Sequence, residues 1–200
     1  MSRKFVYFFG ADRTEGNESM THLLGGKGAN LGTMSSLGID VPPGFTITTE
    51  ACREYFENKN RFSEGLWDEI QRNLGILEEV MDKQLGSRTQ PLLVSVRSGA
   101  NVSMPGMMDT VINLGLNDNT LSCLADNTHN ERFALDCYRR FISMFGNVVL
   151  GIEWTKFESV LTKQKTLRKV KFDTDLEIKD IKSIIQKFKN NNVLLGHGIM

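Results

Sequence analysis

Apolar and polar residues repeat along this chain with two periods, one typical of strands and one typical of helices. Residues 4–9 form a β-branched and aromatic run, which predicts a first strand. Between residues 66 and 85 the apolar positions recur every three or four residues, which predicts one long amphipathic helix. The chain therefore combines strand-forming and helix-forming segments from its start.

Turn and capping signals lie between these two segments. The small and apolar residues 29–37 predict a short helix, and Gly38 is expected to end it in the manner of a helix C-terminus. Residues 41–48 are typical of a turn that leads into a strand. Thr49 is then expected to cap a helix over residues 50–56.

A second strand pair is predicted around a long loop. Residues 92–97 predict a strand in which Leu92, Val94 and Val96 face one side. Glycine and proline break both regular patterns over residues 98–109, which predicts a loop. A further short strand is expected at residues 110–114.

The composition shifts to helix after this strand. The expected helices cover residues 117–126, 131–150, 153–164 and 177–189. We therefore predict an α+β protein with a mixed subdomain at 1–116, a helical subdomain at 117–190 and a divergent tail at 191–200.

Composition narrows the function classes. The chain has 24 basic and 24 acidic side chains, and its basic cluster at residues 163–171 holds no aromatic residue, so nucleic-acid binding is not expected. Its apolar runs are far shorter than the ~20 residues that span a bilayer, so no membrane contact is expected. The three cysteines show no CxxC spacing, which argues against a disulfide framework and a zinc site. A protein of a reducing compartment, the cytoplasm by default, is predicted.

Gly25-Gly26-Lys27-Gly28 is the first candidate for ligand chemistry. Three glycines and a cation just before a helix suit an anion, most commonly phosphate. It is not a Walker A loop, because glycine rather than Ser or Thr follows Lys27. A glycine-rich turn with an exposed lysine explains the pattern equally well.

Arg97 and the loop after it form the second candidate. A guanidinium at the end of an apolar strand either pairs with an acidic side chain or is kept for a ligand, whose phosphate oxygens its planar fork can grip. The loop offers glycines, hydroxyls and methionines, whose thioethers could pack against a flat purine ring or simply fill a core. Spacing alone does not decide between these alternatives.

These two stretches also carry a family resemblance. Residues 23–31 (LLGGKGANL), 41–46 (VPPGFT), 93–100 (LVSVRSGA) and 104–110 (MPGMMDT) resemble the pyruvate phosphate dikinase family. The similarity runs from about residue 4 to about residue 190. Phosphoenolpyruvate synthases and glucan dikinases share the lysine and arginine elements, but not the central loop in this form.

The resemblance implies the amino-terminal part of an ATP-grasp-type nucleotide-binding domain. In that family the β,γ-pyrophosphoryl group of ATP passes to a histidine on another domain and then to pyruvate, giving AMP, pyrophosphate and phosphoenolpyruvate. By motif position, Lys27 and Arg97 correspond to the catalytic residues that bind the ATP phosphates. The segment that closes over the nucleotide corresponds to Met104, Gly106, Met107, Met108, Asp109 and Thr110.

The departures from the family matter as much. The family enzyme is several times longer, so the Mg²⁺ ligands, the phosphoryl-accepting histidine and the pyruvate-binding domain are expected outside this chain. We therefore expect that the chain alone is not catalytically complete, while the full enzyme could form a homodimer and could reside in an organelle. The alternative is a non-catalytic remnant that binds a nucleotide or a protein, with the helices of 117–190 as its surface.

Overall fold

The computed structural model describes residues 3–99 and 109–190. The chain divides into two compact units, which are described one at a time. We call residues 1–83 with 98–108 the amino-terminal unit, and residues 84–97 with 109–200 the carboxy-terminal unit. The division into subdomains at residues 116 and 117 stays a prediction.

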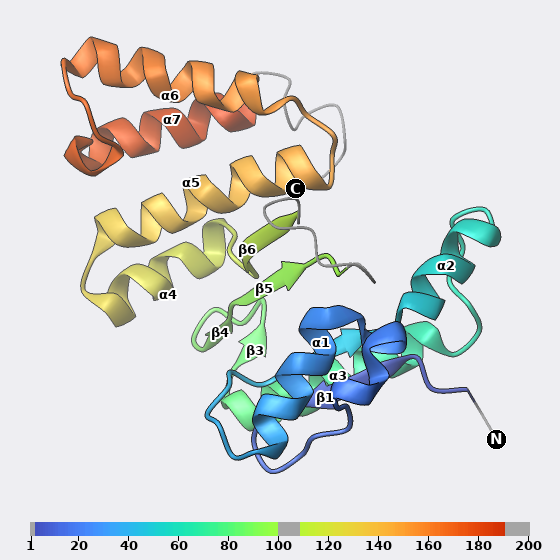
Figure 1. Ribbon diagram of the computed structural model, residues 1–200. Coiled ribbons are helices and arrows are strands. Elements are labelled where there is room, and N and C mark those ends of the chain that lie inside the picture. The colour runs from blue at the N-terminus through green and yellow to red at the C-terminus, as the bar shows by residue number, and fades with distance from the viewer. Residues whose placement is uncertain (1–2, 100–108, 191–200) are drawn as a thin grey trace. The chain divides into compact units, whose positions relative to one another are not determined.

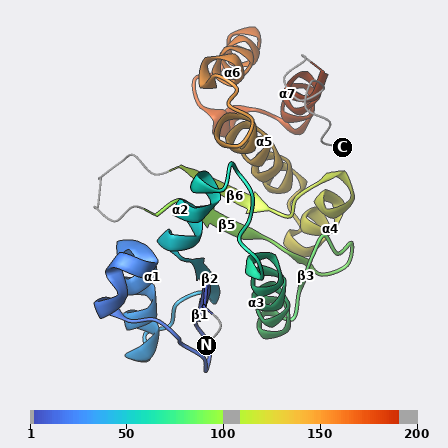
Figure 2. The same ribbon diagram turned by 90° about the vertical axis from the view of Figure 1, so that its right-hand side faces the viewer.

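A pair of antiparallel strands lies at the centre of the amino-terminal unit. β1 (Val6–Phe9) pairs with β2 (Gly44–Ile47), with Val6 opposite Ile47. Helices α1 (Thr21–Ser36) and α3 (Leu66–Met81) pack on the two sides of these strands (Figure 2). Both predicted strands of this unit are confirmed. One buried cluster of this unit consists of Phe5, Val6, Ala51 and Leu66, with Phe45 and Ile70 packed against it.

Helix α1 is longer than the sequence predicted. It follows the short 3-10 turn η1 (Glu18–Met20) and includes the whole glycine-lysine stretch, which the prediction placed ahead of the helix. Gly25 interrupts it with φ 68° and ψ 166°, so a second helical segment starts at Gly26. The predicted end is confirmed: Gly38 has φ 75°, and the N–H groups of Gly38 and Ile39 donate to the carbonyls of Ser35 and Met34.

The two other helices of this unit begin or end at residues that differ from those predicted. α2 (Thr49–Glu57) is capped by Thr48, whose hydroxyl accepts from the N–H of Ala51, and not by Thr49. α3 stops at Met81 because Asp82 takes a left-handed conformation with φ 48°, so the predicted helix over 66–85 was four residues too long.

Two small sheets belong to the carboxy-terminal unit. β3 (Gln84–Leu85) pairs in parallel with β4 (Pro91–Leu92), and β5 (Val94–Arg97) pairs antiparallel with β6 (Thr110–Leu114). The strand predicted at 92–97 is therefore split. The register also shifts between Val94 and Val96, and 51% of Val96 is exposed, so the predicted alternation of faces was wrong.

Four helices complete the carboxy-terminal unit, as predicted. They are α4 (Asp118–Thr128), α5 (Glu131–Val148), α6 (Trp154–Arg168) and α7 (Ile178–Asn190). α5 is the central helix, because α4, α6, α7 and β6 all contact it (Figure 1). The buried core of this unit draws on α5, α6 and α7 and includes Leu135, Ile142, Phe157, Ile181, Ile184 and Phe188, while α4 packs the partly buried Leu121 and Leu124 against it. The predicted α+β class is confirmed.

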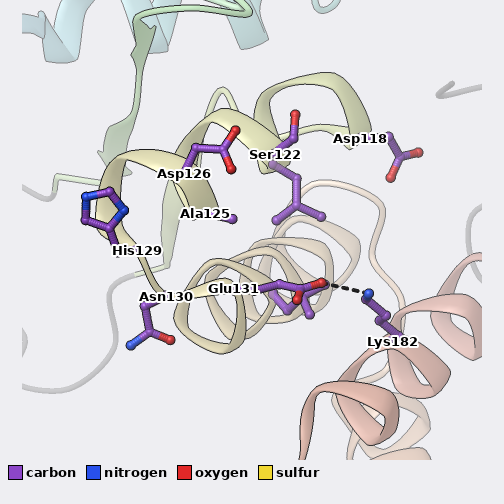
Figure 3. A pocket seen from close by; sticks show the side chains of 10 residues that line it. Asp118, Ser122, Ala125, Asp126, His129, Asn130, Glu131 and Lys182 are labelled. Carbon is purple, nitrogen blue, oxygen red and sulfur yellow. Dashed lines mark ion pairs between the residues drawn. The ribbon is translucent and has the colours of Figure 1, made fainter.

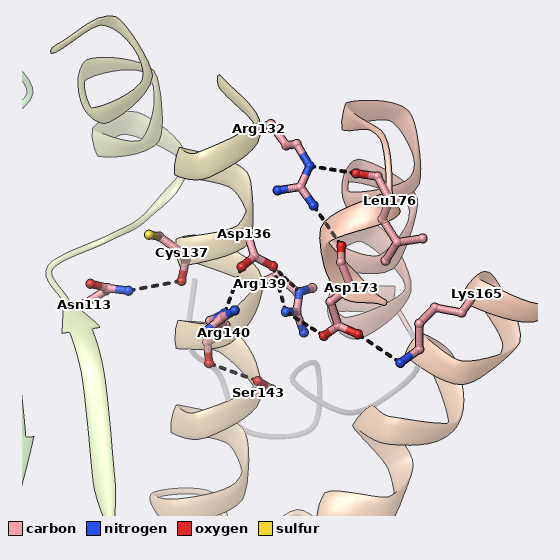
Figure 4. Close-up of polar contacts among 10 residues, drawn as sticks. All are labelled: Asn113, Arg132, Asp136, Cys137, Arg139, Arg140, Ser143, Lys165, Asp173 and Leu176. Carbon is pink, nitrogen blue, oxygen red and sulfur yellow. Dashed lines mark hydrogen bonds and ion pairs between the residues drawn. The ribbon is translucent and has the colours of Figure 1, made fainter. Parts of the chain in front are cut away.

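Polar contacts fasten the segment between α6 and α7 to α5. Arg132 donates to the carbonyls of Leu176 and Asp173, the latter in the 3-10 turn η2 (Asp173–Asp175). Arg139, with only 7% of its side chain exposed, pairs with Asp136 at 2.7 Å and Asp173 at 3.4 Å (Figure 4). These contacts engage the guanidinium groups of Arg132 and Arg139 within the carboxy-terminal unit. In the described part of the chain, no helix is long and apolar enough to cross a membrane.

Candidate functional site

The amino-terminal unit presents Lys27 at a helix start. Gly25 breaks the helix, so Lys27 lies in the first turn of the segment that continues to Ser36. The side chain is exposed, and no described residue of its unit forms an ion pair with it. A helix start carries partial positive charge from its backbone N–H groups, which a lysine reinforces. The local field therefore favours an anion.

The three glycines around Lys27 differ in what their positions require. Gly25 adopts a positive φ that residues with a side chain rarely take. Gly28 is buried, and a Cβ built on it would lie 2.8 Å from both Cγ2 and Oγ1 of Thr46. A Cβ on Gly26 would meet nothing within 4 Å. Close packing therefore accounts for Gly28, which is a reason that neither alternative drawn from the sequence included.

The carboxy-terminal unit presents Arg97 at the end of β5. Arg97 lies opposite Thr110 of β6, so the ends of the loop over residues 98–109 meet at this point. Its side chain is exposed, and none of the described residues in this unit forms an ion pair with it. The structural salt bridge considered from the sequence is therefore not found among those residues.

The loop that completes this candidate site is described only at its ends. Asp109 is exposed and Thr110 is half-buried, next to Arg97 in register. The strand pairing thus brings Arg97, Asp109 and Thr110 together, while Lys27 belongs to the other unit. Four predicted nucleotide contacts lie outside the described residues: Met104, Gly106, Met107 and Met108.

No metal-binding donor set accompanies these cations. Within residues 3–99 and 109–190, no group of three or more His, Cys, Asp and Glu side chains is placed to hold a metal ion. What the described residues offer is positive charge, backbone donors and hydroxyls. Such groups bind phosphate and stabilise charge that moves between phosphates.

A hollow in the helical unit was not predicted from the sequence. It has a volume of about 560 Å³ and lies between α4 and α5, with Lys182 of α7 at its rim (Figure 3). Two of its three acidic residues have partners: Glu131 pairs with Lys182 at 2.7 Å and Asp118 pairs with Lys189, whereas Asp126 forms no ion pair with a described residue. The acidic residues at the α4–α5 junction were the only sequence signal for it. Because its one lysine is already engaged by Glu131, we assign the hollow no ligand.

Comparison with known proteins supports the family resemblance that was based on the two stretches singled out above. Residues 21–83, which include Lys27, match the family described as pyruvate phosphate dikinase, AMP/ATP-binding domain. The chain is 54% identical over 187 residues to the chloroplastic pyruvate, phosphate dikinase of Mesembryanthemum crystallinum and 52% identical over 189 residues to that of Flaveria trinervia. It is 50% identical over 190 residues to pyruvate, phosphate dikinase 1 of Arabidopsis thaliana, also chloroplastic.

These alignments cover the two chains unequally. They include 94% of this chain for the first two relatives and 95% for the third, but the chain spans only 20% of the length of each. The similarity at this level extends through both units and through Arg97 and its loop. The resemblance recognised in the sequence is thereby confirmed: this chain is similar to pyruvate, phosphate dikinases over nearly its whole length, and its residues 21–83 match the model of the AMP/ATP-binding domain.

Proposed function

We propose that this chain supplies the amino-terminal part of the ATP-binding portion of a pyruvate phosphate dikinase. The full enzyme would convert ATP, phosphate and pyruvate to AMP, pyrophosphate and phosphoenolpyruvate through a phospho-histidine on another domain. The observation that carries this proposal is the 50–54% identity to enzymes of that name over nearly the whole chain. An ATP-grasp-type fold of the complete domain is part of the proposal.

In this proposal Lys27 and Arg97 hold the phosphates of ATP. Both side chains are exposed, and neither forms an ion pair with a described residue of its own unit. Exposed cations without acidic partners keep their full charge for an anionic ligand. Lys27 adds its charge to a helix start, and Arg97 stands at the mouth of the loop that would close over the nucleotide, with Met104, Gly106, Met107, Met108, Asp109 and Thr110 as its contacts.

In this proposal, the chain binds the phosphates of ATP, and other parts of the full enzyme supply the remaining groups of the reaction. Cations fixed around the phosphates would stabilise the charge that develops as the pyrophosphoryl group leaves. Mg²⁺ would neutralise the same phosphates when bound, and its ligands would come from polypeptide outside this chain. The accepting histidine and the pyruvate site would lie there too. The 200 residues are therefore proposed to bind nucleotide without turning it over.

The expected affinity of the isolated chain is low. A hydrogen bond to a charged group contributes about 1.5–3 kcal/mol, so two such cations supply about 3–6 kcal/mol. A micromolar dissociation constant needs about 8 kcal/mol. The dissociation constant of this chain for ATP should therefore fall between about 0.04 and 6 mM.

The experiment is an NMR titration of the chain with ATP, read from backbone amide shifts, which follows millimolar binding. We expect Lys27→Ala and Arg97→Ala each to weaken binding, while Lys83→Ala, an exposed lysine of the amino-terminal unit, leaves it unchanged. Equal binding in all four proteins would overturn the role given to the two cations. Absence of any ATP response would favour the alternative in which the chain is a non-catalytic remnant that binds a protein.

Location and assembly remain separate proposals. The relatives from Mesembryanthemum, Flaveria and Arabidopsis are chloroplastic by name, whereas the cytoplasm predicted for this chain stays a prediction.

A homodimer of the full enzyme is likewise a prediction. Gel filtration of the chain and of a complete enzyme would test it.

A further inference from the structure

We propose that Gly28 is a positioning residue: its contact with Thr46 fixes how far Lys27 stands from the β1–β2 strand pair. The inference rests on the proposed function, in which Lys27 binds the phosphates of a nucleotide. It concerns a residue that would not touch the ligand itself. Its role is to set the place of the residue that does.

The contact between the helix and the strand leaves no room for a side chain. A Cβ on Gly28 would lie 2.8 Å from Cγ2 and 2.8 Å from Oγ1 of Thr46, and 3.2 Å from Cβ of Leu24. Ordinary contacts of a Cβ begin at 3.4 Å, so the glycine brings the helix backbone nearer to the strand than alanine could. Thr46 cannot easily give way, because it is β-branched and is paired with Tyr7 in the sheet.

The contact between Gly28 and Thr46 lies next to Lys27 and therefore affects where Lys27 is placed. Lys27 directly precedes Gly28 and follows the break at Gly25, so the helical segment begins with the residues that touch the strand. Further along the same helix, a Cβ on Gly32 would lie 2.5 Å from the carbonyl oxygen of Gly16. Two backbone-close contacts one turn apart therefore hold this end of α1 in one place.

An added methyl group at position 28 should displace Lys27. To reach an ordinary contact the helix must retreat from Thr46 by at least about 0.6 Å, and shifts near 1 Å are enough to disrupt catalytic geometry. Loss of the lysine contact to a phosphate would weaken ATP binding by about 10- to 100-fold. A smaller displacement would give part of this loss.

Three variants, with Thr46→Ala alone as the reference for the double variant, separate positioning from simple packing. Gly28→Ala introduces the clash, and Gly28→Ala combined with Thr46→Ala removes the two Thr46 atoms that it meets. Gly75→Ala is the matched control, because it adds the same methyl group to helix α3 of the same unit, where nothing lies within 4 Å. For each protein, three quantities are measured: the ATP dissociation constant by NMR, the amide shift of Lys27 without nucleotide, and the free energy of unfolding.

We expect Gly28→Ala to raise the ATP dissociation constant by about tenfold or more and to move the Lys27 amide shift. The double variant should return both toward the values of Thr46→Ala alone, and Gly75→Ala should match the wild type in ATP affinity. A purely structural role would lower the unfolding free energy of Gly28→Ala without changing its ATP dissociation constant. That outcome, or a double variant without recovery, would overturn the inference.

Failure of the proposed function would give a different result from failure of the positioning inference. In that case Lys27→Ala would bind ATP as the wild type does, whatever the result at position 28. The amide shift of Lys27, which needs no ligand, would then still report the contact. An unchanged shift in Gly28→Ala would refute the positioning by itself.

Discussion

Asp180 in the first turn of α7 gives the sharpest test of how the helical unit is held together. Only 3% of this residue is exposed, yet its carboxylate is ionised and fully engaged. It accepts hydrogen bonds from Nε2 of Gln164 at 2.9 Å, from Nε of Arg168, and from the backbone N–H of Glu177 at 3.2 Å. Asp180→Asn keeps the shape of the side chain and removes its charge.

The expected loss can be worked out from these contacts. Removing one partner of a buried ion pair costs about 3–5 kcal/mol when the other charge stays buried. Arg168 is 36% exposed and can turn to water, which reduces that cost. The amide also places an N–H where the carboxylate accepted bonds, and each buried donor left unpaired costs about 1–3 kcal/mol. We therefore expect Asp180→Asn to lower the unfolding free energy by about 2–4 kcal/mol.

The pH dependence supplies a second signature. Burial raises the pKa of Asp180, but the hydrogen bonds from Arg168, Gln164 and the Glu177 N–H outweigh it and hold the pKa below its usual value. The unfolded chain therefore takes up the proton first as the pH falls, so the protein loses stability in acid. The contribution is complete above the unfolded pKa of about 3.9 and disappears as the pH falls through the lower folded value.

Trp154 of α6 reports on this unit and Trp67 of α3 on the other. Urea denaturation in a Trp67→Phe background, followed by the fluorescence of Trp154, measures the unfolding free energy between pH 7 and about pH 3. The control is Glu177→Gln, which removes an exposed carboxylate three residues away and should stay within about 0.5 kcal/mol of wild type. Equal stabilities of the Asp180 and Glu177 variants at pH 7 would refute the assignment, as would a constant difference down to acid pH.

Other changes test single contacts. Gly32→Ala should destabilise the amino-terminal unit by about 1–3 kcal/mol in urea, since its Cβ would meet the Gly16 carbonyl, which has no side chain to move. Glu15→Gln should cost about 1–3 kcal/mol near pH 7. Burial raises the pKa of Glu15, but the hydrogen bonds from the Phe8 N–H, Arg13 and Lys4 outweigh it, so the pKa is lower than usual. The cost should therefore shrink as the pH falls below about 4. Asn117→Ala removes the α4 cap and should cost about 1 kcal/mol by thermal melting.

Helix starts and stops show what sequence can predict here. Gly38 was identified as a helix end because a left-handed residue there favours glycine, and the structure has it. The end of α3 was missed because Leu85 continues the apolar period and no glycine or proline marks the stop. Asp82 makes that turn with a left-handed φ of its own. Adjacent threonines gave a one-residue error at α2, since either hydroxyl could serve as the cap.

The strand that carries Arg97 shows why periodicity fails at a bulge. Alternation predicts faces only while the pairing register is constant, and here the register shifts between Val94 and Val96. The Val96 side chain is therefore exposed to solvent. Strict alternation would place it on the same face as Leu92, which is only 2% exposed. The end of the strand was still predicted correctly, because Arg97 and the glycine after Ser98 break the apolar run.

The glycine-lysine stretch shows why composition alone could not separate a ligand site from a packing contact. Glycine is required for its conformation at Gly25 and for its lack of a side chain at Gly28, and neither requirement involves an anion. Gly26 meets no atom that would exclude a methyl group. The number of glycines is therefore weak support for phosphate binding here. What favours an anion is the exposed Lys27 at the start of a helix, and Gly28 matters because it holds that start against the strands.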